Sequence, residues 1–204
     1  MHITETAIPG LLIIGLDVHG DNRGWFKENW QREKLTELAP KLASFQPVQN
    51  NISYNHAGAT RGLHAEPWDK LVSVAQGKIF GAWCDLREGS ESFGEVVTHE
   101  VGPETAVFVP RGVANGFQAL EETSYCYLVN EHWSAEALYS AVNLNIIDWP
   151  LEPTEISKKD KQHPALEDVS PMPARRILVT GANGQLGRAL KRLLADAEFC
   201  TCLL

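Results

Sequence analysis

The sequence predicts a mainly β domain over about its first 150 residues, built as a barrel or sandwich of antiparallel strands. Short apolar runs rich in β-branched and aromatic residues alternate there with Gly, Pro and Asn, which is typical of such folds. An apolar fraction of 44% with six tryptophans provides enough surface to bury in one core. Near the end of the chain the pattern changes to one strand, a glycine turn and a helix.

The expected strands of the main domain are short runs separated by turn residues: LLIIGLDV, KLVSVAQG, KIFGAWCDL, EVVTHEV, TAVFVPRG and SYCYLVNEHW. Gln76-Gly77 separates two of these runs and predicts a hairpin turn. One segment breaks the alternation, because leucines between residues 35 and 42 recur at helical spacing. Pro40 limits the length of a single helix there, so we expect a short surface helix.

The end of the chain predicts a linker and part of a second domain. Residues 154–174 are polar, charged and proline-bearing, so we expect a tail or linker between a domain at 1–153 and a fragment at 175–204. The fragment opens with RILVTG, which predicts a strand. Three glycines follow at the start of a predicted helix: Gly181, Gly184 and Gly187.

Glycines in this register permit a tight turn, close approach to a pyrophosphate and close helix packing, as in the first unit of a dinucleotide-binding Rossmann domain. About 30 residues supply only one β-strand and one helix of such a domain, so the nucleotide site would be incomplete. Without partner strands, RILVTG is expected to be mobile or to pair with another chain.

The composition excludes several classes of partner. A net charge of −8 argues against nucleic acid and anionic membranes, since both are bound through clustered Lys and Arg. No stretch approaches 18 apolar residues, and the N-terminal segment lacks the basic start of a signal peptide. No cysteine pair has zinc-site spacing. We therefore expect a cytoplasmic protein with free thiols.

Longer motifs follow one another along the main domain: GDNRGWFKENW, PVQNNISYN, TRGLHAEPWDK, VFVPRGVANGF, NIIDWP and ISKKDKQHP. Together they resemble the dTDP-4-dehydrorhamnose 3,5-epimerase family across nearly all of residues 1–165. ILVTGANGQLG resembles the opening of dTDP-4-dehydrorhamnose reductase, so the chain resembles an epimerase fused to the start of a reductase. The resemblance implies a cupin-type jelly roll (double-stranded β-helix), usually a homodimer, acting on a dTDP-linked keto-sugar without a cofactor. NADPH or NADH would be needed only by a complete reductase.

The chemistry of that family assigns roles to several residues. Inverting a carbon beside a ketone requires a base on one face, a group that holds the enolate charge, and an acid on the other face. The resemblance implies that His64 is the base and that Lys70 stabilises the oxyanion. It implies phosphate contacts for Arg23 and Arg61, since guanidinium groups can donate paired hydrogen bonds to phosphate. Further positions implied to line the substrate site are Phe26, Glu28, Gln49, Asn51, Asn115 and Trp133.

Four of these family positions are changed in this sequence. The family acid is a tyrosine, and the alignment puts Trp133 there, although an indole N–H does not release a proton near neutral pH. The aspartate that orients the base aligns with Val142 or Asn143. Asn115 replaces a histidine, and Glu66 replaces a glutamine.

Glu66 follows His64 by two residues and therefore lies on the same face of the strand. This position makes it a candidate to orient His64 or to act as the missing acid. His64 and Glu66 would also give a metal ion two donors, but no second histidine stands at H-x-H spacing; His56, His99 and His132 remain as distant alternatives. We predict no metal.

Two functions remain open. The first is an enzyme that epimerises a dTDP-4-keto-6-deoxy sugar at C3, C5 or both, in dTDP-L-rhamnose biosynthesis. The alternative is a catalytically weakened module that binds the sugar nucleotide or dimerises, and so supports a fused reductase. The surviving base, enolate and phosphate positions favour the enzyme, while the changed acid and orienting positions motivate the alternative.

Overall fold

The computed structural model describes residues 1–175, 180–181 and 183–193. The chain divides into two compact units, Met1–Pro173 and Ala174–Leu204. The first unit consists mainly of strands, which confirms the mainly β class expected from the sequence.

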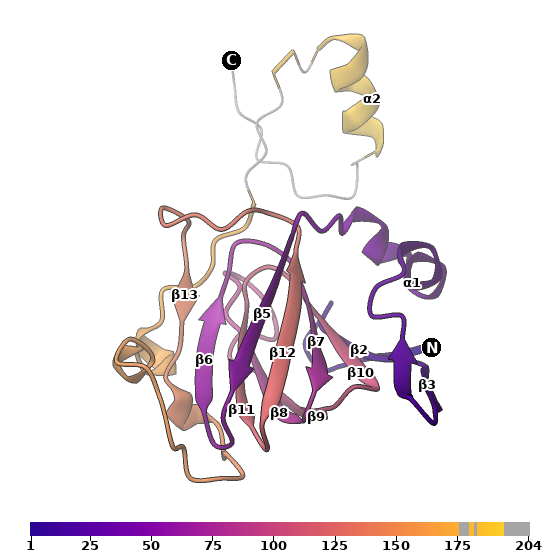
Figure 1. The fold of residues 1–204 in the computed structure, drawn as a ribbon. Coiled ribbons are helices and arrows are strands. Elements are labelled where there is room, and N and C mark those ends of the chain that lie inside the picture. The colour runs from indigo at the N-terminus through magenta and orange to yellow at the C-terminus, as the bar shows by residue number, and fades with distance from the viewer. Residues whose placement is uncertain (176–179, 182, 194–204) are drawn as a thin grey trace. The chain divides into compact units, whose positions relative to one another are not determined.

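One layer of the first unit is a six-stranded antiparallel sheet (Figure 1). Its strands are β1 (His2–Glu5), β2 (Leu12–Gly15), β5 (Gln49–Asn55), β7 (Lys70–Gln76), β10 (Thr105–Val109) and β12 (Thr123–Val129). They lie side by side in the order β1-β2-β10-β7-β12-β5. Apart from β1 and β2, neighbours in this order are distant in sequence, so the sheet forms only when most of the domain has folded.

The second layer is a five-stranded antiparallel sheet in the order β13-β6-β11-β8-β9. Its strands are β6 (Thr60–Ala65), β8 (Ile79–Asp85), β9 (Val96–Val101), β11 (Val113–Ala119) and β13 (Ser140–Ala141). A separate hairpin joins β3 (Val18–Asp21) to β4 (Gly24–Lys27). The core between the two sheets includes Val72 and Val74 from β7 and Trp83 from β8.

The hairpin predicted at Gln76-Gly77 is wrong in its pairing. The chain does turn there, with Gly77 at a φ of +84°, where a Cβ would lie 2.4 Å from the carbonyl oxygen of Glu122. However, β7 and β8 on either side belong to opposite sheets. The turn therefore carries the chain from one layer to the other, which is how the two layers close over a shared core.

The predicted short helix is present as α1 (Arg32–Leu38), followed by a 3-10 turn, η1 (Pro40–Ser44). The side chain of Gln31 caps α1 by accepting a hydrogen bond of 2.8 Å from the Lys34 N–H. Leu35 and Leu42 are buried against the outer face of the six-stranded sheet, in a cluster that includes Leu71 from β7. Alternation along β7 thus sends Val72 to one side of the sheet and Leu71 to the other.

Residues 154–173 pack on the first unit, whereas a tail or linker was expected. The Thr60 N–H donates to the carbonyl of Glu155 at 2.9 Å, and the Met172 N–H donates to that of Leu86 at 2.7 Å. Met172 is buried in a cluster with Leu63 and Leu86. Three 3-10 turns follow the last strand: η2 (Leu144–Ile146), η3 (Asp160–Gln162) and η4 (Leu166–Asp168). The linker prediction was wrong because it rested on the polar composition of the segment, whereas a few apolar residues such as Met172 are enough to anchor it.

In the second unit a helix, α2 (Gln185–Leu193), covers the segment predicted to be helical. Gly181 before it has a φ of +69°, as a tight turn requires. The strand predicted from RILVTG falls largely on residues 176–179, outside the described residues, so the dinucleotide-binding fragment stays a prediction. Within the described parts of both units, no helix has the length and apolar character needed to cross a bilayer.

Candidate active site

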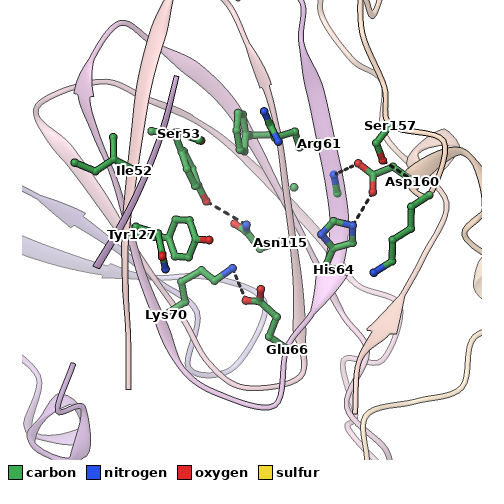
Figure 2. A pocket seen from close by; sticks show the side chains of 16 residues that line it. Ile52, Ser53, Arg61, His64, Glu66, Lys70, Asn115, Tyr127, Ser157 and Asp160 are labelled. Atoms are coloured by element: carbon green, nitrogen blue, oxygen red, sulfur yellow. Dashed lines mark hydrogen bonds and ion pairs between the residues drawn. The ribbon is translucent and has the colours of Figure 1, made fainter. Parts of the chain in front are cut away.

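A pocket of about 380 Å³ opens between the two sheets of the first unit (Figure 2). One wall comes from β5, β7 and β12 of the six-stranded sheet, and the other from β6 and β11, with residues 157–160 at the rim. The side chains that give it chemical character are polar: Asn51, Arg61, His64, Glu66, Lys70, Asn115, Tyr127 and Asp160.

His64 on β6 pairs with Asp160 of η3, a contact between residues 96 positions apart. The distance from His64 Nε2 to Asp160 Oδ1 is 2.8 Å, and the second carboxylate oxygen accepts from the Gly62 N–H at 3.4 Å. The side chain of Asp160 is only 7% exposed. Burial alone would raise the pKa of Asp160, but its interaction with His64 and the hydrogen bond from the Gly62 N–H outweigh it and lower that pKa. Asp160 is therefore an ionised carboxylate that fixes the imidazole, while the other ring nitrogen of His64 faces the pocket.

The residue that orients His64 was placed wrongly in the sequence alignment. Val142 is buried in the apolar core, and Asn143 caps η2 by accepting from the Asn145 N–H. The carboxylate comes instead from Asp160, inside the motif ISKKDKQHP. Glu66 does not orient His64 either, because its carboxylate forms an ion pair with Lys70.

Gly62 allows the close approach of β6 to β11 that sets the position of His64. Its φ is +120°, and a Cβ at this residue would lie 2.5 Å from the Cα of Gly116. The ladder between the two strands also shifts register between Asn115 and Phe117. A side chain at Gly62 would push β6 outward and separate His64 from the pocket.

Lys70, Glu66 and Tyr127 lie close together in the lining of the pocket (Figure 2). The Lys70 side chain is 8% exposed, and its ammonium lies 4.7 Å from the centroid of the Tyr127 ring. Burial raises the pKa of Tyr127, and the negative charge of Glu66 raises it further, while Arg61 acts in the opposite direction. The phenol is thus protonated at neutral pH and is able to donate a proton.

Tyr127 lines the pocket, whereas Trp133, the residue that the sequence alignment offered as the acid, does not. Tyr127 lies on β12, on the wall opposite His64 (Figure 2). Trp133 follows that strand, is 66% exposed and is not one of the residues that line the pocket. The signal was present in the run SYCYLVN, because alternation along a strand puts Tyr125, Tyr127 and Val129 on one face.

The remaining polar residues of the pocket are held by neighbours. The Asn115 Oδ1 accepts from the indole N–H of Trp83 at 2.9 Å, and its amide donates to the Tyr125 hydroxyl at 3.1 Å. The Arg61 Nε donates to Asn55 Oδ1 at 2.7 Å, which leaves the rest of its guanidinium at the pocket. Asn51 accepts a hydrogen bond of 2.9 Å from the side-chain amide of Gln49. Gln49 itself is not one of the residues that line the pocket.

A family model described as dTDP-4-dehydrorhamnose 3,5-epimerase matches residues 5–168. The chain belongs to this family. A "Protein RmlC homolog" of Streptococcus pyogenes serotype M6 is 50% identical over 176 residues, covering 81% of this chain and 89% of the relative. The matched range of the epimerase family ends at residue 168, so a fusion to a reductase remains a prediction.

Solved structures of the epimerase family share this fold. RmlC from Streptococcus suis, in complex with dTDP-D-xylose, has a TM-score of 0.78 at 47% identity, with coverage of 84% of this chain and 94% of that one. RmlC from Legionella pneumophila, in complex with dTDP-4-keto-L-rhamnose, has a TM-score of 0.77 at 30% identity, with coverage of 86% and 99%. These likenesses extend across nearly the whole first unit.

Besides Gln49 and Trp133, three more residues expected from the epimerase family to touch substrate lie outside the pocket of their own chain. Arg23 is in the turn between β3 and β4, with a side chain that is 90% exposed and paired with Asp21. Phe26 on β4 is exposed, and Glu28 just after it forms an ion pair with Lys34. These three side chains thus lie on the surface of the chain, and none of them lines the pocket that contains His64.

The described residues contain one group able to hold a metal ion, and it differs from the donors considered in the sequence. It consists of His64, Asp160 and His163, whose potential ligand atoms all lie within 4.8 Å of one another. Burial and the nearby His64 lower the pKa of His163, which is therefore a neutral imidazole. Glu66, which the sequence put forward as a second donor, is occupied by Lys70.

Proposed function

We propose that this chain is an isomerase that epimerises a dTDP-linked 4-keto-6-deoxy sugar at C3 and C5, as a step of dTDP-L-rhamnose biosynthesis. The observation that carries the proposal is a base and an acid on opposite walls of one pocket, with an ammonium group between them. Membership of the 3,5-epimerase family supports the reaction type. The ligands of the S. suis and L. pneumophila relatives support a dTDP-sugar as substrate.

His64 removes the proton from the carbon next to the ketone. Asp160 accepts a hydrogen bond from the Nε2–H of His64, so the lone pair of Nδ1 is directed into the pocket. When the C–H bond breaks, its electron pair forms the C=C bond of an enolate, and the ketone oxygen becomes negatively charged. Lys70 donates a hydrogen bond to that oxygen and stabilises it in a site with little water.

Tyr127 completes the inversion by protonating the enolate from the opposite face. Its O–H bond breaks as the new C–H bond forms, and the resulting phenolate then regains a proton while His64 releases the one it took. The C4 ketone makes both C3 and C5 acidic, so one set of groups acts on each carbon in turn. The substrate is neither oxidised nor reduced overall, and we propose that the reaction uses no cofactor.

Arg61 is placed to bind the phosphates of the nucleotide, because it lies in the pocket beside the catalytic groups. Arg23, Phe26 and Glu28 reach a pocket only on a second copy of the chain. A homodimer in which each β3–β4 hairpin contributes to the partner's site therefore belongs to the proposal. Large exposed apolar side chains on the hairpin and on β5, such as Trp25 and Ile52, support it.

The alternative of a weakened binding module rested on a missing acid and a missing orienting carboxylate. Tyr127 and Asp160 supply both groups, so this observation no longer favours it.

Incubation with dTDP-4-keto-6-deoxyglucose in deuterated water tests the function. The wild-type protein should place deuterium at C3 and C5, as read by NMR, because both carbons are reprotonated from groups that exchange with solvent. His64→Asn should abolish the exchange, and Tyr127→Phe should slow epimerisation by about 100-fold or more. His56→Asn, which changes an exposed histidine, is the matched control. Exchange in His64→Asn at the wild-type rate would overturn the proposal.

A further inference from the structure

His163 is a buried histidine with unsatisfied polar atoms. Its side chain is 7% exposed, and neither ring nitrogen has a hydrogen-bond partner among the described residues. Buried polar groups without partners cost free energy and are rare in folded proteins. Its ring packs edge-on against that of His64, with centroids 5.0 Å apart. His163 does not line the substrate pocket, so the proposed reaction gives it no task.

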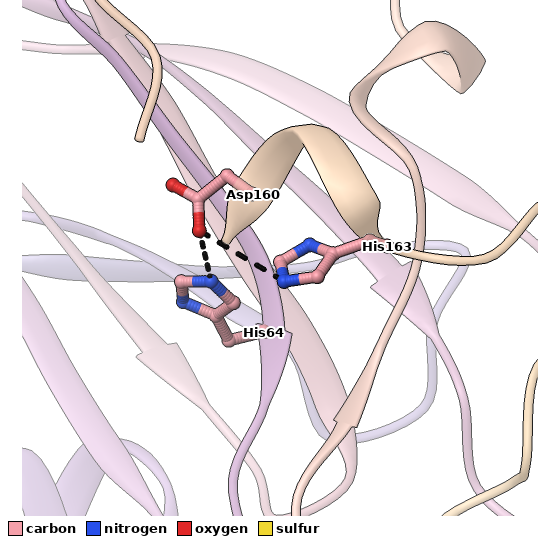
Figure 3. Close-up of side chains that lie close together, drawn as sticks. All are labelled: His64, Asp160 and His163. Atoms are coloured by element: carbon pink, nitrogen blue, oxygen red, sulfur yellow. Dashed lines mark hydrogen bonds and ion pairs between the residues drawn. The ribbon is translucent and has the colours of Figure 1, made fainter. Parts of the chain in front are cut away.

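His163 and His64 approach the same oxygen atom (Figure 3). Asp160 Oδ1 lies 2.8 Å from His64 Nε2 and 3.9 Å from His163 Nε2. In a tetrahedral zinc site with bonds of about 2.0–2.2 Å, neighbouring ligand atoms are about 3.3 Å apart. To bind zinc, the distance from Asp160 Oδ1 to His64 Nε2 would therefore increase by about half an ångström. The distance from Asp160 Oδ1 to His163 Nε2 would decrease by about the same amount.

We propose that His64, Asp160 and His163 bind one divalent transition-metal ion of the zinc type, and that the bound ion inhibits the enzyme. Two imidazoles and one carboxylate whose ligand atoms lie within 4.8 Å of one another are a donor set that suits Zn²⁺. The free oxygen of Asp160 is held by the Gly62 N–H, and the Asp160 N–H donates to Ser157 Oγ at 3.0 Å. Such outer contacts orient metal ligands in known sites.

The bound ion would inhibit the enzyme because it changes which nitrogen of the His64 ring carries the proton. The inhibition, unlike the metal site, rests on the proposed function. A neutral imidazole carries one proton, which sits on Nε2 when that atom donates to Asp160. An ion bonded to Nε2 displaces this proton to Nδ1. Nδ1 is the atom that must accept the substrate's proton, so the metal-bound histidine is no longer a base. The ion also breaks the hydrogen bond between His64 and Asp160.

His163→Phe separates this site from the catalytic machinery. Phenylalanine keeps the ring packed against His64, removes both metal-binding nitrogens and leaves no unpaired polar atom at position 163. The variant should therefore fold, with a melting temperature equal to or above that of the wild type. His56→Phe, at an exposed histidine outside the group, is the control for adventitious surface binding.

The test is a titration of the EDTA-treated, full-length protein with ZnCl₂, followed by isothermal calorimetry and by the epimerase assay. The wild type and His56→Phe should bind one ion per chain and lose activity as the site fills, with recovery on adding EDTA. His163→Phe should bind at least 10-fold more weakly and keep its activity at the same zinc concentration.

Equal binding by the wild type and His163→Phe, or no binding by the wild type at micromolar zinc, would overturn the metal site. The calorimetric result decides this without any turnover. Metal-free wild-type protein without epimerase activity would instead contradict the proposed function. Stoichiometric binding that leaves an active enzyme unaffected would overturn the inhibition.

Discussion

Glu66 carries a negative charge beside both Lys70 and Tyr127, the residues proposed to stabilise the oxyanion and to act as the acid. Its carboxylate forms an ion pair with Lys70, and its negative charge raises the pKa of Tyr127 in addition to the effect of burial. The two effects help the reaction in different ways. Glu66 holds the Lys70 ammonium in the pocket before substrate arrives, and it keeps the Tyr127 phenol protonated beside a cation that would otherwise favour the phenolate.

Glu66→Gln should move the alkaline limb of the pH profile of kcat/KM to lower pH. The substitution removes a negative charge that raises the pKa of Tyr127, so that pKa falls and the phenol loses its proton at a lower pH. Gln is similar in size and keeps the packing of the pocket. The measurement is kcat/KM from pH 6 to pH 10, with Glu100→Gln at an exposed ion pair as the control. An alkaline limb at the wild-type pH would show that Glu66 does not act on Tyr127.

At the scale of elements, the loop between β8 and β9 is held by a buried carboxylate. Asp85 at the end of β8 is fully buried, forms a two-pronged ion pair with Arg87, and accepts hydrogen bonds from Ser90 and Ser92. Burial alone would raise the pKa of Asp85, but these hydrogen bonds bring it down to about 2. The Asp85 carboxylate must therefore stay ionised to hold the loop in place.

Asp85→Asn should lower the free energy of unfolding at pH 7 by about 2–3 kcal/mol, because it removes the partner of a largely buried Arg87. The pKa of Asp85 in the folded protein is below the usual aspartate value of about 3.9. The stabilisation is therefore fully present above about pH 4 and is lost as the pH falls towards 2. Urea unfolding at pH 7 and at pH 3 measures this, and the difference between wild type and variant should shrink at pH 3. A constant difference would contradict it.

The elements were largely predictable because their signals are local, whereas their partners were not. Short apolar runs bounded by turn residues mark β7, β8, β10 and β12, and the spacing of leucines marks α1. The turn at Gln76-Gly77 was visible, but no local signal tells whether two strands joined by a turn share a sheet.

The candidate site shows the same division between local and distant information. His64, Lys70 and Arg61 lie in one compact motif of the sequence, and all three line the pocket. Asp160 reaches His64 from 96 residues away, on a segment whose polar composition suggested a linker. Tyr127 was missed because the aromatic residue after the strand was aligned with the acid, although the strand's own alternation directs Tyr127 inward.

For the whole molecule, the position of the β3–β4 hairpin is the reason for proposing a homodimer with shared sites. Arg23 and Phe26 are exposed on that hairpin, away from the pocket of their own chain. In the proposed homodimer each site combines the catalytic groups of one chain with the hairpin of the other. Closed two-fold symmetry would then produce two identical composite sites.

Mixing two inactive variants should restore activity if the sites are composite. Arg23→Ala and His64→Asn should each lose most activity alone. When they are unfolded together and refolded at equal amounts, half of the dimers are hybrids, and each hybrid has one site with both residues intact. Activity should therefore recover to about one quarter of the wild-type value. The measurement is the epimerase assay after refolding, and no recovery above the separately refolded variants would show that both residues act within one chain.

The late position of Asp160 also has a consequence during synthesis on the ribosome. All strands up to β12 are translated before the segment that carries Asp160, and His64 leads that residue by 96 positions. At about 5–20 residues per second, translation separates the two by about 5–20 seconds. All strands of the six-stranded sheet are therefore synthesised before the carboxylate that orients His64, so the imidazole depends on a segment made after that sheet.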